Sequence, residues 1–396
     1  MRVSVSAWYF LTLGALACAD RQTATDIPAG SEGGWTRVLR LDGGEHDFAD
    51  ADEAVQLSDG SVVVANRGEQ ELLWFSPTGS RLRRVGRRGS GPGEFRGLNS
   101  VAVTHGDTVL AFDGSSLRLT VLSPSGDIAA TLPLQGAVTW SAKLLGVIGD
   151  GRLLFLSSSI PGPYERAEGF GVDSASLLMY DRTTRQAQEL GRVPTRTRVV
   201  DGTGAAAIVL SSPIQATLSV AVCSDSIVVL FGDAAVVGWW GTHGGDQRRE
   251  QALFLDRSPI QRHELDSLVQ ARRSKRSSDL QVRANGVLLR HLDGLRRPFF
   301  QRAALDIDGS VWLSPVGSNS QEPANWIHVG NAGQDIRSLP LPHNGRILGM
   351  TRTRMLVHER DADGVDFFGV YSRPDPMIND RCSSGPAGTS TANLIS

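Results

Sequence analysis

Hydrophobic and polar positions recur in this chain at a fixed spacing. Residues 72–79 (Leu-Leu-Trp-Phe-Ser-Pro-Thr-Gly) are matched 47 residues later by residues 119–126 (Leu-Thr-Val-Leu-Ser-Pro-Ser-Gly). The same spacing places the apolar run 62–64 on the run 109–111. A fixed period in apolar runs and turn residues indicates a repeat architecture, in which each unit buries its hydrophobic face against its neighbours.

Each unit begins with an apolar strand, a tight turn and a second strand rich in β-branched or aliphatic residues. The six second strands are expected at residues 62–64, 109–111, 153–155, 227–229, 311–313 and 355–357. Asp59-Gly60 and similar pairs precede most of them and supply the positive φ angles of a two-residue hairpin. A third and a more polar fourth strand complete the unit. The pattern predicts an all-β fold, a six-bladed β-propeller of four-stranded antiparallel blades.

The two ends of the predicted propeller meet in its last blade. That blade lacks a fourth strand, and residues 35–41, beginning with Trp35, form a lone strand near the N-terminus. We expect this strand to close the last blade, which hides two sheet edges. The propeller then spans residues 35–372. Residues 373–396 are rich in Pro, Gly, Ser and Thr and are predicted to form a disordered tail.

Three insertions lengthen the later blades, at residues 159–172, 194–212 and 258–298. The last contains one predicted helix between blades 4 and 5, with Ser258 as N-cap and Pro259 in the first helical position. The basic residues 272–276 that follow are either a nucleic-acid patch or, as we prefer, a solvated helix terminus.

Strand direction separates two faces of the propeller. First-to-second and third-to-fourth turns lie on one face, which we call the short-turn face. Second-to-third loops and connections between blades lie on the other, the long-loop face, and all three insertions fall there. Long loops on a rigid scaffold commonly carry function, so we expect binding on the long-loop face.

The N-terminus is typical of an exported protein. Arg2 precedes an apolar run to Leu16, so residues 1–17 are predicted to be a signal peptide. Cys18 follows the cut and resembles the acylated cysteine of a bacterial lipoprotein, although Ala15 and Ala17 also suit an ordinary signal peptidase. We expect lipidation at Cys18, a flexible tether over residues 18–34, and a location in the cell envelope, lipid-anchored in the outer membrane or periplasmic.

Composition narrows the classes of partner. The chain has 396 residues, 40% hydrophobic and 21% charged, as in ordinary globular proteins. A formal net charge of -2 gives no general attraction for nucleic acid or anionic lipid. We therefore expect a monomer that meets the membrane only through an N-terminal lipid. Cys223 and Cys382 either form a disulfide or remain separate thiols.

A glycine-rich connection links the first two units. Residues 86–95 (Gly-Arg-Arg-Gly-Ser-Gly-Pro-Gly-Glu-Phe), followed by Val-Ala-Val at 101–103, resemble the NHL repeat, in which a Gly-Pro-Gly-Glu-Phe connection leads into a new blade. Asp113 matches the repeat's usual Asp at the end of the second strand, and Asn66 stands there one blade earlier. From residue 297 onward the chain resembles exported bacterial six-bladed propellers, many without an assigned activity. The resemblance implies the fold and leaves function open.

Sequence motifs for cofactors or metals are incomplete in this chain. Two Asp-x-Asp-Gly segments, at 306–309 and 361–364, have the spacing that opens a calcium loop. Both lack the remaining ligands and the closing glutamate, so we interpret them as hairpin turns. Phosphate-loop, zinc-protease, serine-elbow and Cys-x-x-Cys patterns do not occur. We expect no cofactor, metal or catalytic residue.

Candidate binding residues lie where the first strand of each blade begins, at the mouth of the central channel on the long-loop face. They are Asp52, Asn99, Lys143, Gln215 and Arg302. Such a ring of polar groups either builds a site or only lines a wet channel.

Two classes of function are compatible with this ring. The first is a binding or scaffold module for a protein, peptide or glycan. The alternative is a lactonase- or lyase-type enzyme, which would need convergent carboxylates for a metal, or a His with a partner, at the mouth. Asp52 is the one plausible carboxylate, with Glu53 expected to point the other way, so the binding module is preferred.

Overall fold

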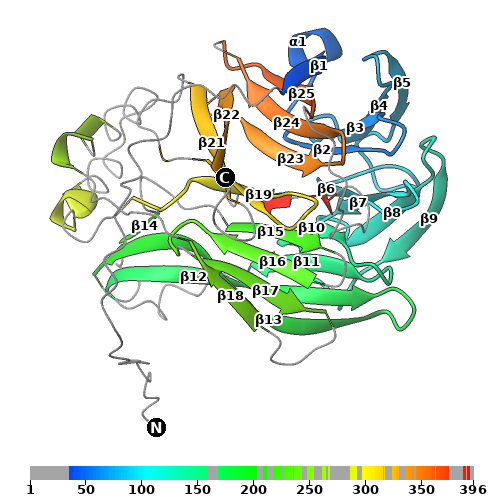
Figure 1. Cartoon of the computed structure of the whole chain (residues 1–396). Helices are drawn as coiled ribbons and strands as arrows, with labels where there is room; N and C mark the ends of the chain where they lie inside the picture. Colours follow the sequence, from blue (N-terminus) through cyan, green and yellow to red (C-terminus); the bar gives the residue numbers. More distant parts are fainter. Residues whose placement is uncertain are drawn as a thin grey trace. The chain divides into compact units, whose positions relative to one another are not determined.

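The structure is a computed structural model. It describes residues 35–158, 168–202, 208–211, 218–223, 226–234, 236–242, 248–253, 261–264, 266–267, 286–291, 297–314, 316, 323–329, 336–342, 345–361, 363–373, 387–388 and 390–392. The described residues form six antiparallel sheets, which are the blades of a β-propeller (Figure 1). The predicted signal peptide, tether and Cys18 lie outside them, as does Gln215.

The first three blades follow one another in the sequence. From the innermost strand outward, blade 1 is β2 (Glu53–Gln56), β3 (Val62–Asn66), β4 (Glu71–Phe75) and β5 (Arg81–Val85). Blade 2 is β6 (Leu98–Val103), β7 (Val109–Asp113), β8 (Arg118–Leu122) and β9 (Ile128–Pro133). Blade 3 is β10 (Ala142–Val147), β11 (Leu153–Ser158), β12 (Gly169–Asp181), β13 (Gln186–Asp201) and β14 (Ile208–Ser211).

The remaining blades include strands from both ends of the chain. Blade 4 is β15 (Leu218–Cys223), β16 (Ser226–Phe231), β17 (Val236–Gly241) and β18 (Arg248–Ala252), with β27 (Ser390–Ala392) on the inner edge of β15. Blade 5 is β19 (Arg302–Leu305), β20 (Val311–Ser314), β21 (Pro323–Val329) and β22 (Ile336–Pro342). Blade 6 is β23 (Arg346–Met350), β24 (Arg354–Arg360), β25 (Asp366–Ser372) and β1 (Thr36–Asp42), with β26 (Ala387–Gly388) on the inner edge of β23.

The innermost strands close the ring. They contact one another in the order β2, β6, β10, β15, β19, β23 and back to β2. Between neighbouring blades lie buried clusters of apolar side chains, for example Val63 and Trp74 of blade 1 against Val101 of blade 2. The sequence folds this way because each strand is too short and too apolar to remain stable without a neighbouring blade.

The N-terminal strand closes blade 6, as predicted. β1 pairs antiparallel with β25 from Thr36 opposite Ser372 to Asp42 opposite Phe367. Leu41 is fully buried beside Phe368 in the core between blades 6 and 1. A four-residue helix, α1 (Gly43–His46), follows β1, and the Asp42 carboxylate caps it by accepting from the Gly44 N–H.

Tight turns account for the hairpin spacing. In blade 1, the Leu57 N–H donates to Ser61 and the Gly60 N–H donates to Leu57. Gly60 has a φ of 90° there, a left-handed conformation that glycine adopts without strain. The same backbone pattern recurs at residues 306–310, so the first Asp-x-Asp-Gly segment is a hairpin turn as interpreted from the sequence.

Blade 3 differs from the expectation of simple inserted loops. Strand pairing continues into both insertions, so that Gly169–Asp173 of β12 lies opposite residues 196–200 of β13, and β14 adds a fifth strand. Register shifts, which are typical of β-bulges, occur between Asp173 and Ser174 and between Leu177 and Leu178. Along β12 the more buried and the more exposed side chains alternate, as expected for a paired strand.

Helical residues occur between blades 4 and 5, as predicted. Residues 262–264 and 266–267 fall within the predicted helix, whereas residues 286–290 form a second helical segment that was not predicted. The predicted N-cap Ser258, Pro259 and the basic run 272–276 lie outside the described residues. In the part of the chain that the structure describes, no helix is long and apolar enough to span a membrane.

The C-terminal region contains pairing that the expectation of a disordered tail does not anticipate. β26 and β27 pair with the innermost strands β23 and β15. Their residues are small and uncharged, so the sequence shows no hydrophobic pattern that would indicate a strand. Cys382 lies outside the described residues, so both alternatives for Cys223 and Cys382, a disulfide or separate thiols, stay open.

Candidate functional site

The candidate site is the channel mouth on the long-loop face, where connections between blades lead into the innermost strands. Glu53, Arg302 and Arg346 are the first residues of β2, β19 and β23. Lys143 is the second residue of β10. Each side chain therefore reaches the mouth from a different blade.

A buried ionic cluster joins three of these blades. Lys143 Nζ donates to Glu53 Oε1 over 2.6 Å, and Arg346 Nη1 lies 3.6 Å from the same oxygen. Glu53 and Arg346 are only 4% and 2% exposed. Because buried charges are stable only when paired, the three side chains depend on one another.

Asp52 extends this cluster toward the solvent. Arg67 Nη2 lies 3.0 Å from Asp52 Oδ1, and Arg346 Nη2 lies 3.9 Å from Oδ2. Burial favours the neutral acid, but the positive charges of Arg346, Arg67 and Lys143 outweigh it and hold the pKa of Asp52 below its ordinary value. Asp52 is therefore ionised at neutral pH.

Arg302 adds a further cation beside Arg346. Its Nη1 donates to the backbone carbonyl of Gly345 over 2.7 Å. Burial, followed by the positive charges of Arg346 and Arg360, lowers the pKa of Arg302 to about 10. The guanidinium remains protonated at neutral pH, in surroundings where an added negative charge would be favourable.

The predicted binding residues are only partly brought together. Asp52 and Lys143 belong to the ionic cluster, and Arg302 lies next to it. Asn99 is half-buried and packs toward Gly114 of its own blade, while Gln215 lies outside the described residues.

The expectation for Glu53 is wrong, because its side chain points toward Lys143 and not away from the site. Asp52 precedes the strand, so the regular alternation of side chains begins only at Glu53. Arg346 and Arg67 were not identified from the sequence. Arg346 occupies the same strand-start position in the sixth repeat, so extending the comparison to that repeat could have found it.

An exposed aromatic side chain accompanies the cluster in sequence. Trp140 is 75% exposed and lies in the connection that leads into β10, three residues before Lys143. Its neighbours are held by hydroxyl contacts, since Thr139 Oγ1 lies 2.9 Å from Ser157 Oγ and Ser141 Oγ donates to Ser158 O over 2.9 Å. Trp is among the residue types that dominate binding hot spots, so Trp140 is a candidate contact for a ligand.

A histidine–carboxylate pair lies behind the mouth. His358 of β24 is opposite Arg346 in the sheet, and its Nε2 lies 3.0 Å from Asp366 Oδ1. Burial lowers the pKa of His358 and outweighs the opposing effect of Asp366, so the imidazole is neutral at neutral pH. Arg360 Nε also donates to Asp366 Oδ1, over 2.9 Å.

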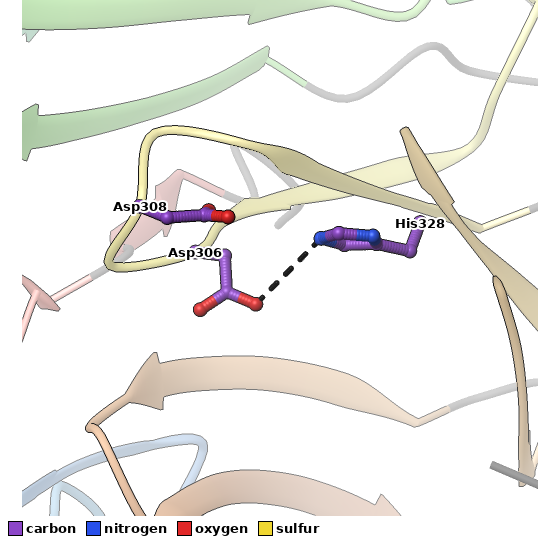
Figure 2. Close-up of side chains that lie close together, drawn as sticks. All are labelled: Asp306, Asp308 and His328. Atoms are coloured by element: carbon purple, nitrogen blue, oxygen red, sulfur yellow. Dashed lines mark ion pairs between the residues drawn. The ribbon is translucent and has the colours of Figure 1, made fainter. Parts of the chain in front are cut away.

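A second cluster, drawn in Figure 2, lies at the β19–β20 turn of the short-turn face. One ligand atom of each of Asp306, Asp308 and His328 lies within 4.8 Å of the others. His328 Nε2 is 3.8 Å from Asp306 Oδ2 and 2.5 Å from Ser310 Oγ. Carboxylate and imidazole groups can bind a divalent cation. Whether a metal would fit depends on the contacts that these three side chains already make.

Those contacts favour a structural role. Both carboxylate oxygens of Asp306 accept from Arg373, Oδ1 over 2.9 Å, and Trp312 Nε1 donates to Oδ2 over 3.0 Å. Arg373 already supplies the positive charge that a metal would bring. It also lies 5.3 Å above the Trp35 ring, which packs edge-on against Trp312 at 6.0 Å. Trp35, just before β1, and Arg373, just after β25, thus attach the two outer strands of blade 6 to blade 5.

No family model and no curated protein matches this chain. Three solved structures are similar to it: a putative exported protein from Bacteroides fragilis (9% identity, 87% of this chain, 96% of that chain, TM-score 0.46), virginiamycin B lyase from Staphylococcus aureus (8%, 85%, 99%, 0.44) and a gluconolactonase from Xanthomonas campestris (11%, 82%, 86%, 0.42). The neighbours are bacterial β-propeller proteins, and some are enzymes. Similarity at this level carries no argument about activity.

Proposed function

We propose that this protein is an exported six-bladed β-propeller that acts as a binding or scaffold module, with its ligand docking at the channel mouth. The observation that supports this most strongly is the ionic cluster of Glu53, Lys143 and Arg346, which joins three blades where the channel opens. Such a network holds polar groups in fixed positions for a ligand. The ligand is a protein, peptide or glycan.

Charge at the mouth favours a ligand that carries a carboxylate. Cations and carboxylates both lie at or beside the cluster among the described residues. The cations are Arg67, Lys143, Arg302 and Arg346, and the carboxylates are Asp50, Asp52 and Glu53. Burial and the positive charges of Arg346 and Arg360 lower the pKa of Arg302, so an acidic ligand group nearby would be favourable, and Trp140 offers an apolar or sugar-stacking surface.

The test is capture of a partner from an envelope extract, followed by substitution on each face. Arg302→Ala and Trp140→Ala should each weaken capture about tenfold or more, as expected for binding anchors. Arg302→Lys, which keeps the charge, should lose less. Changes on the short-turn face, Thr78→Ala and Ser125→Ala, should have no effect. Equal losses from both faces would contradict the proposal.

A second candidate is a lactonase- or lyase-type enzyme, and one observation favours it. The His358–Asp366 pair is the His with a partner that such an enzyme would need. The discriminating experiment combines metal analysis of the purified protein with turnover of a lactone panel. Turnover that is lost in His358→Gln but kept in Trp140→Ala would support the enzyme. Absence of turnover, with capture intact, would favour the binding module.

The proposal also includes NHL-type character for blades 1 and 2. The Asp113 carboxylate accepts from the backbone N–H groups of Arg96 and Gly97 over 2.8 and 3.0 Å. Asn66 Oδ1 accepts from the Ala49 N–H over 2.7 Å in the equivalent place. In both blades, the residue at the end of the second strand therefore fixes the connection that enters the blade, which supports the NHL resemblance.

A further inference from the structure

A cavity of about 320 Å³ lies on the short-turn face, between blades 2 and 3. It is formed by three turns, which connect β6 to β7, β10 to β11 and β12 to β13. Its lining includes Thr104, His105 and Thr108 of the first turn, Gly149 and Gly151 of the second, and Arg182 of the third. Cavities that hold small molecules in proteins begin at about this volume, so the space is sufficient for a small ligand.

Two of these turns have an equivalent in blade 1. In each of the three, the N–H of the first residue donates to the carbonyl of the fifth. The turns are residues 57–61, 104–108 and 148–152. The fourth position has a positive φ in all of them, 90° at Gly60, 58° at Asp107 and 86° at Gly151. The second position is Ser58 in blade 1 and His105 in blade 2. The turns can therefore be compared position by position.

A carboxylate closes the junction between blades 1 and 2. The Ser58 N–H donates to Asp107 Oδ1 over 2.9 Å, and the Ser58 hydroxyl donates to Oδ2. At the junction between blades 2 and 3, the residues in the corresponding positions are His105 and Gly151. Because glycine has no side chain, no carboxylate reaches back from this position to His105. The cavity therefore lies where the preceding junction holds a carboxylate.

Arg182 brings a positive charge to the cavity. A Cβ placed on Gly151 would lie 3.2 Å from Arg182 Nη2, so the guanidinium lies against the Gly151 turn. Among the described residues, no hydrogen bond or ion pair involves the Arg182 side chain. The nearby carboxylates are engaged elsewhere, since Asp181 accepts from backbone N–H groups of its own turn and Asp150 pairs with Arg152. The exposed guanidinium is therefore available to an added anion.

Two further groups of the lining can donate hydrogen bonds. His105 is exposed, and its imidazole carries an N–H in every protonation state. Thr104 Oγ1 accepts from the Thr108 N–H over 3.2 Å, which leaves the hydroxyl hydrogen of Thr104 to donate. The described residues that line the cavity include neither Asp nor Glu. This combination of donors favours an anionic ligand with oxygen acceptors.

We propose that the cavity between blades 2 and 3 is a binding site for a small organic acid. The carboxylate of the acid lies between Arg182 and His105, in the place that Asp107 takes at the preceding junction. A guanidinium is well suited to this role because its N–H groups bind a carboxylate through two parallel hydrogen bonds. The site lies on the face opposite the channel mouth, and it does not depend on the function proposed there.

The first test is calorimetric titration of the full-length protein with acetate, glucuronate, glucose and inorganic phosphate. At least one of the two acids should bind, whereas glucose, which has no carboxylate, should not. Arg182→Met should weaken binding of the acid about tenfold or more, as expected for a lost charge-assisted contact. Arg185→Met is the matched control, because this exposed arginine belongs to the same turn but does not line the cavity, and it should leave binding unchanged.

Three outcomes of this titration would overturn the proposal. The first is that neither acid binds, and the second is that the acid binds equally well to wild type and Arg182→Met. The third is that inorganic phosphate binds more tightly than both acids, which would assign a phosphate site instead. Partner capture through Arg302 and Trp140 should be the same in Arg182→Met as in wild type, so the cavity and the mouth can fail independently.

A second test supplies the carboxylate from the chain itself. Gly151→Asp places an acidic side chain in the position of Asp107, and Asp tolerates the left-handed conformation found there. The variant should lose binding of the acid about tenfold or more, because its own carboxylate competes for Arg182. Gly151→Asn, which has a similar shape and no charge, should lose less. Full binding in Gly151→Asp would mean that the acid does not lie at this position.

Discussion

Single residues at the channel mouth show how burial and charge are balanced. Glu53 is almost fully buried and has Lys143 and Arg346 as its cationic neighbours. Burying a carboxylate costs several kcal/mol unless a cation and hydrogen bonds compensate. The cluster is thus stable as a whole, while each member depends on the others.

Lys143→Met tests this dependence. The substitution keeps the length of the side chain but removes the closest cation from Glu53, and it should lower the free energy of unfolding by about 3 kcal/mol. Arg346 remains near Glu53, which limits the loss. As a control, Arg83→Met removes a solvent-exposed ion pair with Asp127 and should cost less than about 1 kcal/mol. Urea unfolding measures both, and similar losses would contradict the role of burial.

Glu359 presents the opposite balance. Burial raises the pKa of this carboxyl and outweighs the hydrogen bond that Tyr371 OH donates to Oε1 over 2.7 Å. The folded protein therefore binds this proton more tightly than the unfolded chain. Stability from this group is present below its ordinary pKa of 4.5 and is lost as pH rises through the folded pKa.

Glu359→Gln should therefore be more stable than wild type at pH 7, because the amide still accepts from Tyr371 without burying a charge. The difference should shrink as pH falls below about 4.5, where wild type is protonated in both states. Thermal unfolding across this pH range measures it. Glu69→Gln, at an exposed position, should change stability by less than about 0.5 kcal/mol at either pH. A variant that is less stable than wild type at pH 7 would contradict the sign.

At the scale of elements, β1 shows how much one strand contributes to closure. It lies far in sequence from the rest of blade 6, and yet it pairs with β25 from Thr36 to Asp42, with a register shift between Arg37 and Leu39. Leu39 and Leu41 face the core, while Val38 is 52% exposed. This alternation follows from the two-residue period of a strand, and it made β1 predictable from the sequence.

Removal of β1 should expose the edge of β25 and cause aggregation or a large fall in melting temperature. A finer test is Leu41→Ala, which should cost about 2–5 kcal/mol because the side chain is fully buried. Val38→Ala is the matched control and should cost less than about 0.5 kcal/mol. A protein without residues 35–41 that stays monomeric with unchanged melting would mean that closure is not needed.

The long hairpin of blade 3 shows a limit of prediction at this scale. Length changes between repeats located the insertions of blade 3, but did not show that β12 and β13 extend into them. An insertion forms a strand only if another segment pairs with its backbone. Here that pairing segment belongs to the other insertion of the same blade. Two unpatterned segments become strands only by pairing with each other.

At the scale of the whole molecule, both ends of the propeller are fastened at one place. Trp35 precedes β1, Arg373 follows β25, and both contact the Asp306–Trp312 turn of blade 5. This arrangement links blade 5 to the blade that closes the ring. It explains the Asp-rich turn without a bound ion, because Arg373 neutralises Asp306.

The predicted location of the protein in the cell envelope is tested at Cys18. If its thiol is acylated, wild-type protein should partition with membranes and carry the added mass of a lipid. Cys18→Ser should leave an unlipidated precursor or a soluble product, as seen by fractionation and mass spectrometry. Recovery of wild type in the soluble periplasm with an unmodified Cys18 would exclude the anchor.

The sequence by itself determined the six-bladed fold, the hairpin turns and the closing strand, because alternation and turn chemistry are local and recur in every repeat. Only the tertiary structure decided that Glu53 turns toward Lys143, that Arg346 joins them, and that Arg373 neutralises Asp306. These contacts join residues from different blades, and ring closure fixes their distances. The pairing of β26 and β27 with innermost strands is a further case, since backbone pairing requires no side-chain pattern that a sequence could display.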